Sequence, residues 1–309
     1  MPTLDRITVF PVKSLDGLEL ERAEVLAGGG LAHDRRWQFV DLEGCVVHAK
    51  RLAILHAIRA EFEIPGVVRA DRWEEPPAEN TISLAVDPAA LAARAVPGIE
   101  RLAVLRPETF PLVAGTAGPC GWLAEAVGFD VRLLERADGG FPDDREAAGP
   151  TLISTATLVE IARWFGFSLE ECRRRFRANF ELGGCDAFWE DTLAIPARPE
   201  LALPLADLAA DLPADPYAAL PPPEPREFLI GSVGFRATNV CRRCVVPSRD
   251  SRTGAVTEHF RDAFEARRLR VLRADVDAAA WNHVYRAAVN TRPCVAGGSI
   301  FVGDHVGVT

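Results

Sequence analysis

The sequence predicts an α+β fold that is rich in β-strands. Three observations lead to this prediction. Apolar and polar residues alternate through much of the first half, glycine-rich turns separate these short segments, and helical periodicity is clear only beyond residue 116. Short strands joined by such turns favour a small barrel or sandwich over a parallel sheet. With 309 residues, the chain is long enough for two cores, or for one core with a sizeable second lobe.

The first predicted strand covers residues 3–12 and breaks at Lys13-Ser14. Its apolar positions are expected in the core: Leu4, Ile7, Val9 and Val12. A strand over residues 20–27 ends at the triple glycine 28–30, and a hairpin is predicted from Trp37 to His48 around a turn at Leu42-Glu43-Gly44. Further strands are expected near residues 56–63, 81–85, 129–134, 231–240 and, around a Gly303-Asp304 turn, 299–308.

Helices are predicted in the second half, where apolar residues recur with a helical period. Ser154 is expected to cap a helix that follows it, and Ser168 opens a capping-box pattern before a short arginine-rich helix. The predicted helical segments are residues 116–128, 155–165, 169–176, 259–272 and 278–289. Residues 196–225 contain nine of the 23 prolines, so a surface excursion or linker is predicted there.

Charge and cysteine content exclude several classes of protein. The 44 acidic and 35 basic side chains give a net charge of −9, which repels a polyphosphate backbone, so no nucleic-acid partner is expected. Any anionic ligand must therefore bind in a local basic pocket. The seven cysteines do not follow the spacing of a secreted disulfide framework, and neither a signal-peptide h-region nor a membrane-spanning apolar run is visible. We therefore expect a cytoplasmic protein with reduced thiols and no membrane contact.

The run Cys241-Arg242-Arg243-Cys244 is the most conspicuous chemical feature. A structural zinc site needs two more ligands, and no second cysteine pair exists at short spacing. A thioredoxin-like dithiol lies between a strand and a helix, whereas a loop without helical period follows here. Flanking arginines favour a thiolate, the form that binds a soft metal. Spacing alone leaves open whether the run binds a soft metal. The simpler alternative is that both thiols are structural and both arginines are solvated.

Two further basic clusters could bind an anion. Four arginines occur at residues 173–177, and we assign Arg173 and Arg174 to a solvated helix face. Arg177 and Asn179 lie where the helix is expected to give way to a strand, a good position for hydrogen-bond donors to an anion. The other cluster combines Lys13 and Ser14, at the end of the first strand, with Arg35. By itself each cluster is a weak signal.

Taken in order, six motifs resemble one known family. FPVKSLDG, GLAHDRRW, RFRANF, FWED, CRRCVVPSRDSRTG and SIFVGDHV resemble the MOSC proteins that carry an N-terminal β-barrel domain, the group that contains the mitochondrial amidoxime-reducing component and its bacterial relatives. The resemblance runs from about residue 4 to about residue 307. It implies a MOSC N-terminal β-barrel domain over residues 1–115 and, over residues 116–309, a MOSC domain built on a β-barrel with flanking helices and a proline-rich insertion at about 196–225.

The resemblance also implies a site. In this family a molybdenum-molybdopterin cofactor lies between the two domains, and the second cysteine of the run is the molybdenum ligand, which assigns Cys244 as catalytic residue and metal ligand. The matching positions imply that the cofactor is bound by Lys13, Ser14, Arg35, Arg177, Asn179, Arg242 and Arg243. Asn290 resembles a further residue beside the cofactor. Cys241 is expected to be structural, since the family pattern singles out only the second cysteine.

What the resemblance implies for activity is a molybdenum-dependent oxidoreductase of the amidoxime-reducing type, independent of pyridoxal phosphate, that reduces small N-hydroxylated substrates by two electrons. The sequence contains no ferredoxin-type cysteine set, so the electrons are expected from an external ferredoxin-like or cytochrome b5-like protein with its reductase. An alternative is a sulfur-carrier or cofactor-handling protein with a persulfide on Cys244, because MOSC domains also occur in molybdenum cofactor sulfurases. A scaffolding protein unrelated to molybdenum is a third hypothesis, supported only by the proline-rich stretch.

Overall fold

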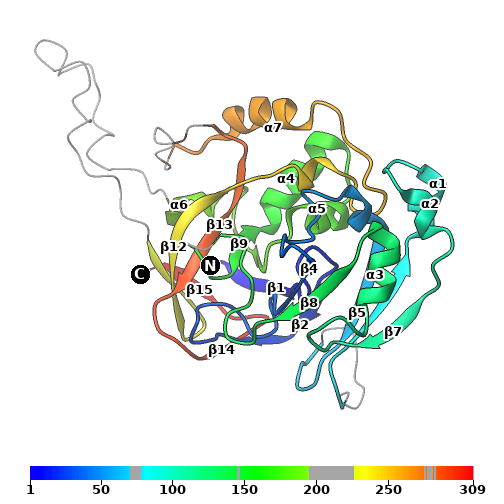
Figure 1. Ribbon diagram of the computed structural model, residues 1–309. Coiled ribbons are helices and arrows are strands. Elements are labelled where there is room, and N and C mark those ends of the chain that lie inside the picture. The colour runs from blue at the N-terminus through cyan, green and yellow to red at the C-terminus, as the bar shows by residue number, and fades with distance from the viewer. Residues whose placement is uncertain are drawn as a thin grey trace, which may run out of the picture.

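A computed structural model describes residues 1–69, 78–144, 147–194, 226–274, 276, 281 and 283–308. The predicted α+β, strand-rich fold is confirmed, with mixed sheets and short helices (Figure 1). The proline-rich stretch predicted at 196–225 lies outside the described residues. No helix in the part of the chain that the structure describes has the length and apolar character needed to span a membrane.

Eight strands form one large sheet in the order β15-β11-β12-β13-β9-β10-β1-β2. Their bounds are β1 Thr3–Val9, β2 Leu18–Leu20, β9 Thr151–Ser154, β10 Phe180–Gly183, β11 Glu227–Ile230, β12 Val233–Arg242, β13 Arg286–Pro293 and β15 Val306–Val308. Neighbours are antiparallel except β9 and β10, which run parallel. The Leu4 amide donates to the Asp304 carbonyl at 2.8 Å and the Val306 amide donates to the Pro2 carbonyl at 2.9 Å, so the sheet curls until β15 reaches the start of β1.

Three smaller sheets complete the strand pairing. They are β3 (Arg22–Glu24) with β14 (Ser299–Phe301), β4 (Trp37–Asp41) with β8 (Val131–Glu135), and β5 (Ile58–Glu63), β6 (Thr81–Val86) and β7 (Glu108–Pro111) in that order. The β3–β14, β4–β8 and β1–β10 pairs each join strands from opposite sides of residue 115. The domain boundary at that residue stays a prediction.

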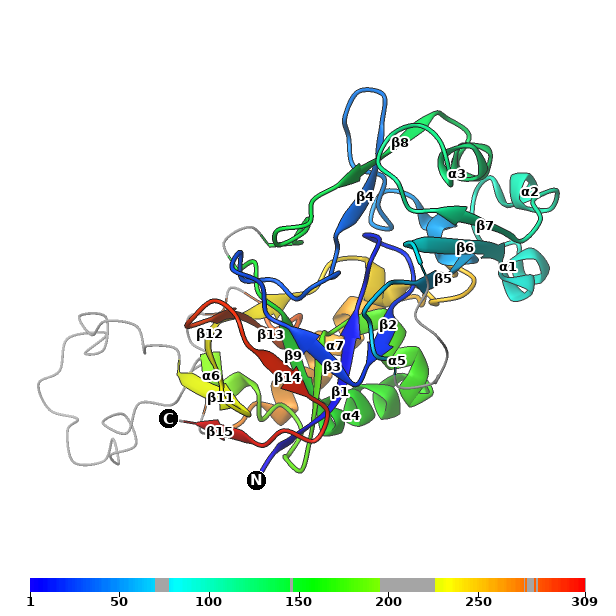
Figure 2. The ribbon, with the colours of Figure 1, turned by 90° about the horizontal axis from the view of Figure 1, so that it is seen from below.

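The helices gather in two places. One group lies beside the β5–β6–β7 sheet and β8 (Figure 2): α1 (Pro88–Ala93), α2 (Ile99–Leu102), α3 (Cys120–Val127) and the 3-10 turn η1 (Ala53–Ala57). The other group lies on the side of the large sheet: α4 (Thr155–Phe165), α5 (Leu169–Phe176), α6 (Asp191–Ala194) and α7 (Phe260–Arg268). Two short 3-10 turns follow β12 and α7, η4 (Val246–Ser248) and η5 (Leu269–Val271). An aromatic cluster joins α4, α5 and α7, with the Phe165 and Phe260 ring centroids 4.2 Å apart. This cluster is a second core beside the large one beneath the sheets.

Most predicted elements occur where the sequence placed them. The expected core residues of the first strand are fully buried, and Ser154 accepts a hydrogen bond from the Thr157 amide as the predicted cap of α4. The helix predicted over residues 278–289 is wrong for all its described residues, because residues 281 and 283–285 are not helical and residues 286–289 belong to a strand. Residues 286–289 begin β13, which lies between β12 and β9 in the middle of the large sheet. Residues 278–280 and 282 of that prediction lie outside the described residues.

Replacing Ser168 with alanine should lower the free energy of unfolding by about 1 kcal/mol. Its hydroxyl accepts a hydrogen bond from the Glu171 amide at 3.1 Å, and this amide has no partner inside the helix. Urea denaturation of the two proteins measures the difference. Ser168→Gly is the matched control, since glycine tolerates the cap backbone and should lower the free energy of unfolding by only about 0.3 kcal/mol. An equal loss in both variants would contradict the cap assignment.

Candidate functional site

A cavity of about 1060 Å³ is lined on one side by the large sheet and α5 and on the other by η1 and β5. Its lining residues come from segments far apart in the sequence. These include the turn after β1, the turn before β4, residues 177 and 179 after α5, and the end of β12. All eight site residues predicted from the sequence line this cavity: Lys13, Ser14, Arg35, Arg177, Asn179, Arg242, Arg243 and Cys244. Asn290, on β13, lines it as well.

Lys13 and Arg35 are placed side by side by backbone pairing. The Lys13 amide donates to the Trp37 carbonyl at 2.9 Å, and the Arg35 amide donates to the Phe10 carbonyl at 2.8 Å. Ser14 and Arg35 both adopt positive φ, 72° and 49°, a conformation that costs side-chain-bearing residues free energy and is common at functional sites. The Ser14 hydroxyl accepts a hydrogen bond from the Ala49 amide at 3.2 Å.

One carboxylate contacts both cations. Asp143 lies 3.0 Å from Lys13 Nζ and 3.6 Å from Arg35 Nε. Burial acts to raise the pKa of Asp143, but the charges of Arg35 and Lys13 outweigh it and hold the pKa well below its usual range. Burial likewise acts to lower the pKa of Arg35, and Asp34 together with Asp143 raises it instead. Arg35 therefore stays positively charged and Asp143 stays ionised.

Arg177 adds a third cation to Lys13 and Arg35. Together with Asn179 these residues form one side of the cavity, here called the basic wall. Arg177 ends α5 in the left-handed conformation, with φ 52°, and its guanidinium lies 4.1 Å from the centroid of the Phe10 ring and donates to the Leu15 carbonyl at 2.7 Å. Burial, and then the neighbouring charge of Arg35, lower the pKa of Arg177 to about 10. The guanidinium is thus still protonated at neutral pH, in surroundings that an added anion would stabilise.

The Asn179 side chain is buried and joins three segments of the chain. Its Nδ2 donates to the Thr8 carbonyl at 2.9 Å, and its Oδ1 accepts from the Thr151 amide at 3.1 Å and from Arg35 Nη1 at 3.4 Å. Asn179 therefore fixes the side chain of Arg35 relative to β1 and β9. This contact gives it a positioning role in the basic wall.

The two cysteines of the Cys241–Cys244 run lie in different surroundings. Cys241 is buried in β12, its thiol donates to Asn290 Oδ1 at 3.0 Å, and burial raises its pKa to about 11. Cys244 is half-buried on the cavity, and its carbonyl accepts a hydrogen bond from the Tyr285 hydroxyl at 3.1 Å. All seven cysteines are free thiols. In the described residues no group of three or more His, Cys, Asp or Glu side chains is arranged to hold a metal ion.

Arg242 and Arg243 point to different places. Arg242 is exposed at the end of β12, on the rim of the cavity. Arg243 donates from Nη2 to the Phe176 carbonyl at the last turn of α5, and its guanidinium lies 5.1 Å from the centroid of the Phe176 ring. Its Nε is buried without a hydrogen-bond partner among the described residues. Arg243 thus ties the Cys244 segment to the helix that ends at Arg177.

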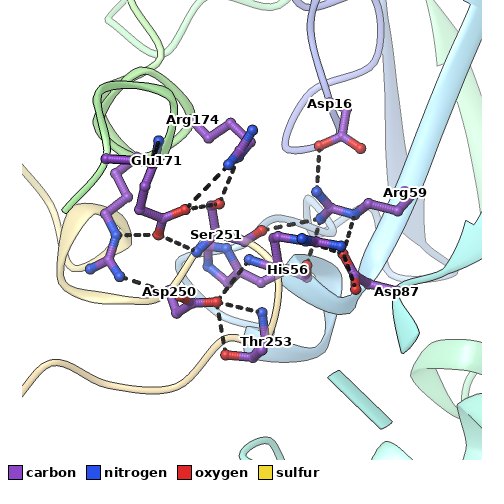
Figure 3. A network of polar contacts seen from close by, with 12 residues as sticks. Asp16, His56, Arg59, Asp87, Glu171, Arg174, Asp250, Ser251 and Thr253 are labelled. Atoms are coloured by element: carbon purple, nitrogen blue, oxygen red, sulfur yellow. Dashed lines mark hydrogen bonds and ion pairs between the residues drawn. The ribbon is translucent and has the colours of Figure 1, made fainter. Parts of the chain in front are cut away.

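Figure 3 shows a polar network that sequence reasoning missed. Ser251 is its centre: its amide donates to Glu171 Oε1 at 2.9 Å, its hydroxyl accepts from Arg174 Nε at 3.0 Å, and its carbonyl accepts from Arg59 Nη2 at 3.1 Å (Figure 3). Arg59 also pairs with Asp16 at 3.2 Å. The network fastens the loop after Cys244 to α5 and to β5, so it holds one wall of the cavity in place.

His56 lies beside this network and lines the cavity. Burial, and then the charges of Arg249 and Arg177, lower the pKa of His56 to about 4, so its ring is neutral at pH 7. Its Nε2 is buried and has no hydrogen-bond partner among the described residues. No motif in the sequence drew attention to His56, and Ser251 lies within the CRRCVVPSRDSRTG motif without being singled out there.

The assignment of Arg173 to a solvated helix face is wrong. Arg173 forms a two-point ion pair with the buried Glu181 of β10, at 2.7 and 2.6 Å, and also contacts Glu170. The hydrogen bond to Glu181 raises the pKa of Arg173 above its ordinary value. Arg174 is exposed, as predicted, and its guanidinium also joins the Ser251 network. Arg175 is buried, with its guanidinium carbon 4.0 Å from the centroid of the Phe167 ring, so these arginines stabilise the position of α5.

Comparison with known proteins finds one matching family model and several curated relatives. Residues 1–96 match the model of the MOSC N-terminal beta barrel domain. Curated relatives include the molybdenum cofactor sulfurases of Drosophila yakuba and Drosophila melanogaster, each 27% identical over 265 residues, and that of Drosophila erecta, 26% identical over 265 residues. Each match covers 82% of this chain but only 28% of the relative, so the chain spans less than a third of the length of these proteins.

The residues that match the model of the MOSC N-terminal beta barrel domain line only part of the cavity. Lys13, Ser14 and Arg35 lie in the matched residues 1–96, together with His56 and Arg59. Arg177, Asn179 and the Cys241–Cys244 run lie beyond the match, in the region where the large sheet and α5 are formed. The resemblance to a MOSC protein with this N-terminal domain is confirmed.

Proposed function

We propose that this chain binds a molybdenum cofactor in the cavity and reduces N-hydroxylated compounds by two electrons. The observation that carries the proposal is that eight residues from distant segments line one cavity of about 1060 Å³. Sites for drug-sized ligands typically enclose about 300–1,000 Å³, so this cavity has room for a cofactor and a small substrate. The names of the curated relatives, molybdenum cofactor sulfurases, support a role related to this cofactor.

The residues fit an anionic group at one end of the cavity. A phosphate monoester carries close to two negative charges and three strong acceptor oxygens. Lys13 and Arg35 provide adjacent cations there, and the nearby Arg177 has its charge destabilised by burial and by Arg35, so an anion would relieve it. We assign these three residues to bind the phosphate of the cofactor. Ser14 and Asn179 lie on the same side of the cavity, and Asn179 positions Arg35 through a hydrogen bond.

The residues at the other wall fit a soft metal. A cysteine thiolate is the ligand type that molybdenum–sulfur chemistry requires, and the half-buried Cys244 lies on the cavity, where it is accessible. When bound, the cofactor would supply the two-electron redox chemistry, with Cys244 as its single protein ligand. Arg243 and the Ser251 network hold the segments before and after Cys244, and so orient its thiol.

The proposed reaction breaks the N–O bond of the substrate, takes up two electrons and two protons, and releases water. We propose that the electrons come from an external ferredoxin-like or cytochrome b5-like protein with its reductase. His56 is neutral at pH 7 and offers a ring nitrogen as a hydrogen-bonding group to a bound molecule. The buried Cys241 takes no part, since its thiol remains protonated and contacts Asn290.

A second candidate function is sulfur transfer or cofactor handling with a persulfide on Cys244. It is favoured by the names of the curated relatives, which are sulfurases rather than reductases. It uses the same half-buried thiol and the same basic cavity. The two functions differ in what Cys244 carries: a retained metal in the first, and a second sulfur atom in the other.

Replacing Cys244 with alanine should abolish molybdenum binding. The protein is produced in a host that makes the cofactor, purified without chelator and analysed for molybdenum, with Cys45→Ala as the matched control because Cys45 is an exposed free thiol outside the cavity. We expect wild type and Cys45→Ala to retain molybdenum and Cys244→Ala to lose it. Undiminished molybdenum in Cys244→Ala would overturn the ligand assignment.

Two measurements separate the candidate functions. Benzamidoxime reduction with an artificial electron donor is expected for the wild type and absent for Cys244→Ala. Intact-mass analysis reports a persulfide as one added sulfur atom. A persulfide on Cys244 without molybdenum in any preparation would replace the reductase proposal with the sulfur-transfer one.

A further inference from the structure

The segment from Gly139 to Asp144 lies directly across the Lys13–Arg35 cation pair. The Phe141 amide donates to the Arg35 carbonyl at 2.8 Å, and Lys13 Nζ donates to the Phe141 and Pro142 carbonyls at 3.2 and 3.3 Å. At Gly140, with φ +63°, a Cβ would lie 2.4 Å from the Asp34 carbonyl oxygen, so only glycine permits this close approach. The backbone of the segment is therefore fixed against both cations.

At the end of this segment the Asp143 carboxylate lies between the two cations, one oxygen near each, at 3.0 Å from Lys13 Nζ and 3.6 Å from Arg35 Nε. This is the arrangement that an external anion would adopt with the same two residues. We propose that Asp143 is a specificity-determining residue, whose carboxylate occupies the anion position of the cavity until a bound anion displaces it. The inference rests on the proposed anion-binding role of Lys13 and Arg35.

The three side chains differ in how easily they can move. The side chains of Lys13 and Arg35 are only 14% and 12% exposed, whereas that of Asp143 is 54% exposed. Both cations also keep other partners if Asp143 leaves: Lys13 keeps its two carbonyls, and Arg35 keeps its ion pair with Asp34. The carboxylate can therefore turn into water while the cations remain in place. Asp143 is the replaceable member of the group.

This arrangement selects between classes of anion. A carboxylate ligand has the charge and shape of the Asp143 side chain, so it gains nothing by replacing an internal group that is already tethered. A phosphate monoester carries close to two charges and one more acceptor oxygen, so it interacts more strongly with Lys13 and Arg35. The site therefore admits phosphate-bearing ligands and rejects simple carboxylates.

Removing the carboxylate should tighten phosphate binding and remove this selectivity. The chain of residues 1–309 is produced in a host that lacks the molybdenum cofactor. Inorganic phosphate and acetate are then titrated at constant ionic strength by calorimetry and by thermal unfolding. Asp143→Ala is expected to bind phosphate at least about fivefold more tightly than wild type, because an internal competitor is removed. Acetate should raise the melting temperature of Asp143→Ala by replacing the missing carboxylate, and leave that of the wild type unchanged.

Asp138→Ala is the matched control, because Asp138 immediately precedes the segment from Gly139 to Asp144, its side chain is 89% exposed, and its carboxylate lies 3.5 Å from Arg136 Nε. It should behave as wild type. Asp143→Asn, which keeps the side-chain volume, should bind phosphate as Asp143→Ala does, and serves if the alanine variant fails to fold. Equal phosphate affinity in wild type and both Asp143 variants, abolished by Lys13→Ala, would overturn the competitor role and leave the anion site standing. Absence of phosphate binding in every variant would overturn both.

Discussion

Replacing Arg268 with methionine is expected to lower the free energy of unfolding by about 3–5 kcal/mol. Arg268, the last residue of α7, forms an ion pair with Asp191 at the start of α6, and both side chains are essentially inaccessible to solvent. Its guanidinium also lies 3.8 Å from the centroid of the Phe188 ring. Methionine keeps the volume of the side chain but leaves Asp191 as a buried charge without this cation, and that desolvation is the main loss.

Urea denaturation of wild type and Arg268→Met measures this loss. Arg163→Met is the matched control, because Arg163 forms an ion pair with Glu160 at 2.9 Å while its side chain is 74% exposed, and it should change little. The double variant Arg268→Met/Asp191→Leu should recover most of the stability, since it removes both buried charges together. If the single Arg268→Met variant is as stable as the Arg163→Met control, the buried pair does not hold α6 against α7.

Glu190 should make the stability of the protein fall as the pH rises from about 4.5 to about 7. Burial, and then the neighbouring charge of Asp191, raise the pKa of Glu190 from 4.5 to about 7. Below pH 4.5 the carboxyl is protonated in both the folded and the unfolded state. Between pH 4.5 and 7 only the unfolded state releases the proton, so unfolding becomes more favourable, and above pH 7 the loss is complete. One pKa unit corresponds to about 1.4 kcal/mol, so the loss is on the order of 3 kcal/mol.

Glu190→Gln tests this pH dependence, because the amide does not ionise. The difference in free energy of unfolding between Glu190→Gln and wild type should shift in favour of the variant by on the order of 3 kcal/mol between pH 4.5 and pH 8. Denaturant titrations at several pH values provide the measurement, and Glu125→Gln, at an exposed position of α3, controls for the removal of one carboxylate. A constant difference between Glu190→Gln and wild type over this range would mean that Glu190 ionises in the folded state much as it does in the unfolded one.

The sequence predicted the elements whose local signals agree with their tertiary role. Ser154 and Ser168 cap helices because their hydroxyls satisfy amides that any helix leaves open, so a local pattern is enough. The helix prediction over residues 286–289 failed because the local pattern there does not distinguish a helix from a strand. These residues are buried because β13 has neighbours on both sides. The apolar run Ala287-Ala288-Val289 has the same appearance in a buried strand and in a helix.

The cations and the thiol of the candidate site were predicted from the sequence, but the carboxylate that contacts the cations was not. Lys13, Arg35 and Cys244 belong to motifs with a family resemblance, and the structure places them around one cavity. Asp143 lies in a turn rich in glycine and proline, where an aspartate is ordinary, and nothing local connects it with Lys13, which lies 130 residues earlier. Such pairs arise from the tertiary fold, so a single sequence carries no signal for them.

The order in which the chain leaves the ribosome follows from the strand pairing. The Lys13 and Arg35 side chains are synthesised more than 200 residues before Cys244, and β1 finds its partner β10 only after residue 180 has emerged. Contacts of such long sequence separation form slowly. A nascent chain therefore exposes an incomplete basic wall for most of its synthesis, and the cavity closes only when β12 and β13 have joined the sheet. Any ligand that fills this cavity must be loaded late, into a polypeptide that has almost finished folding.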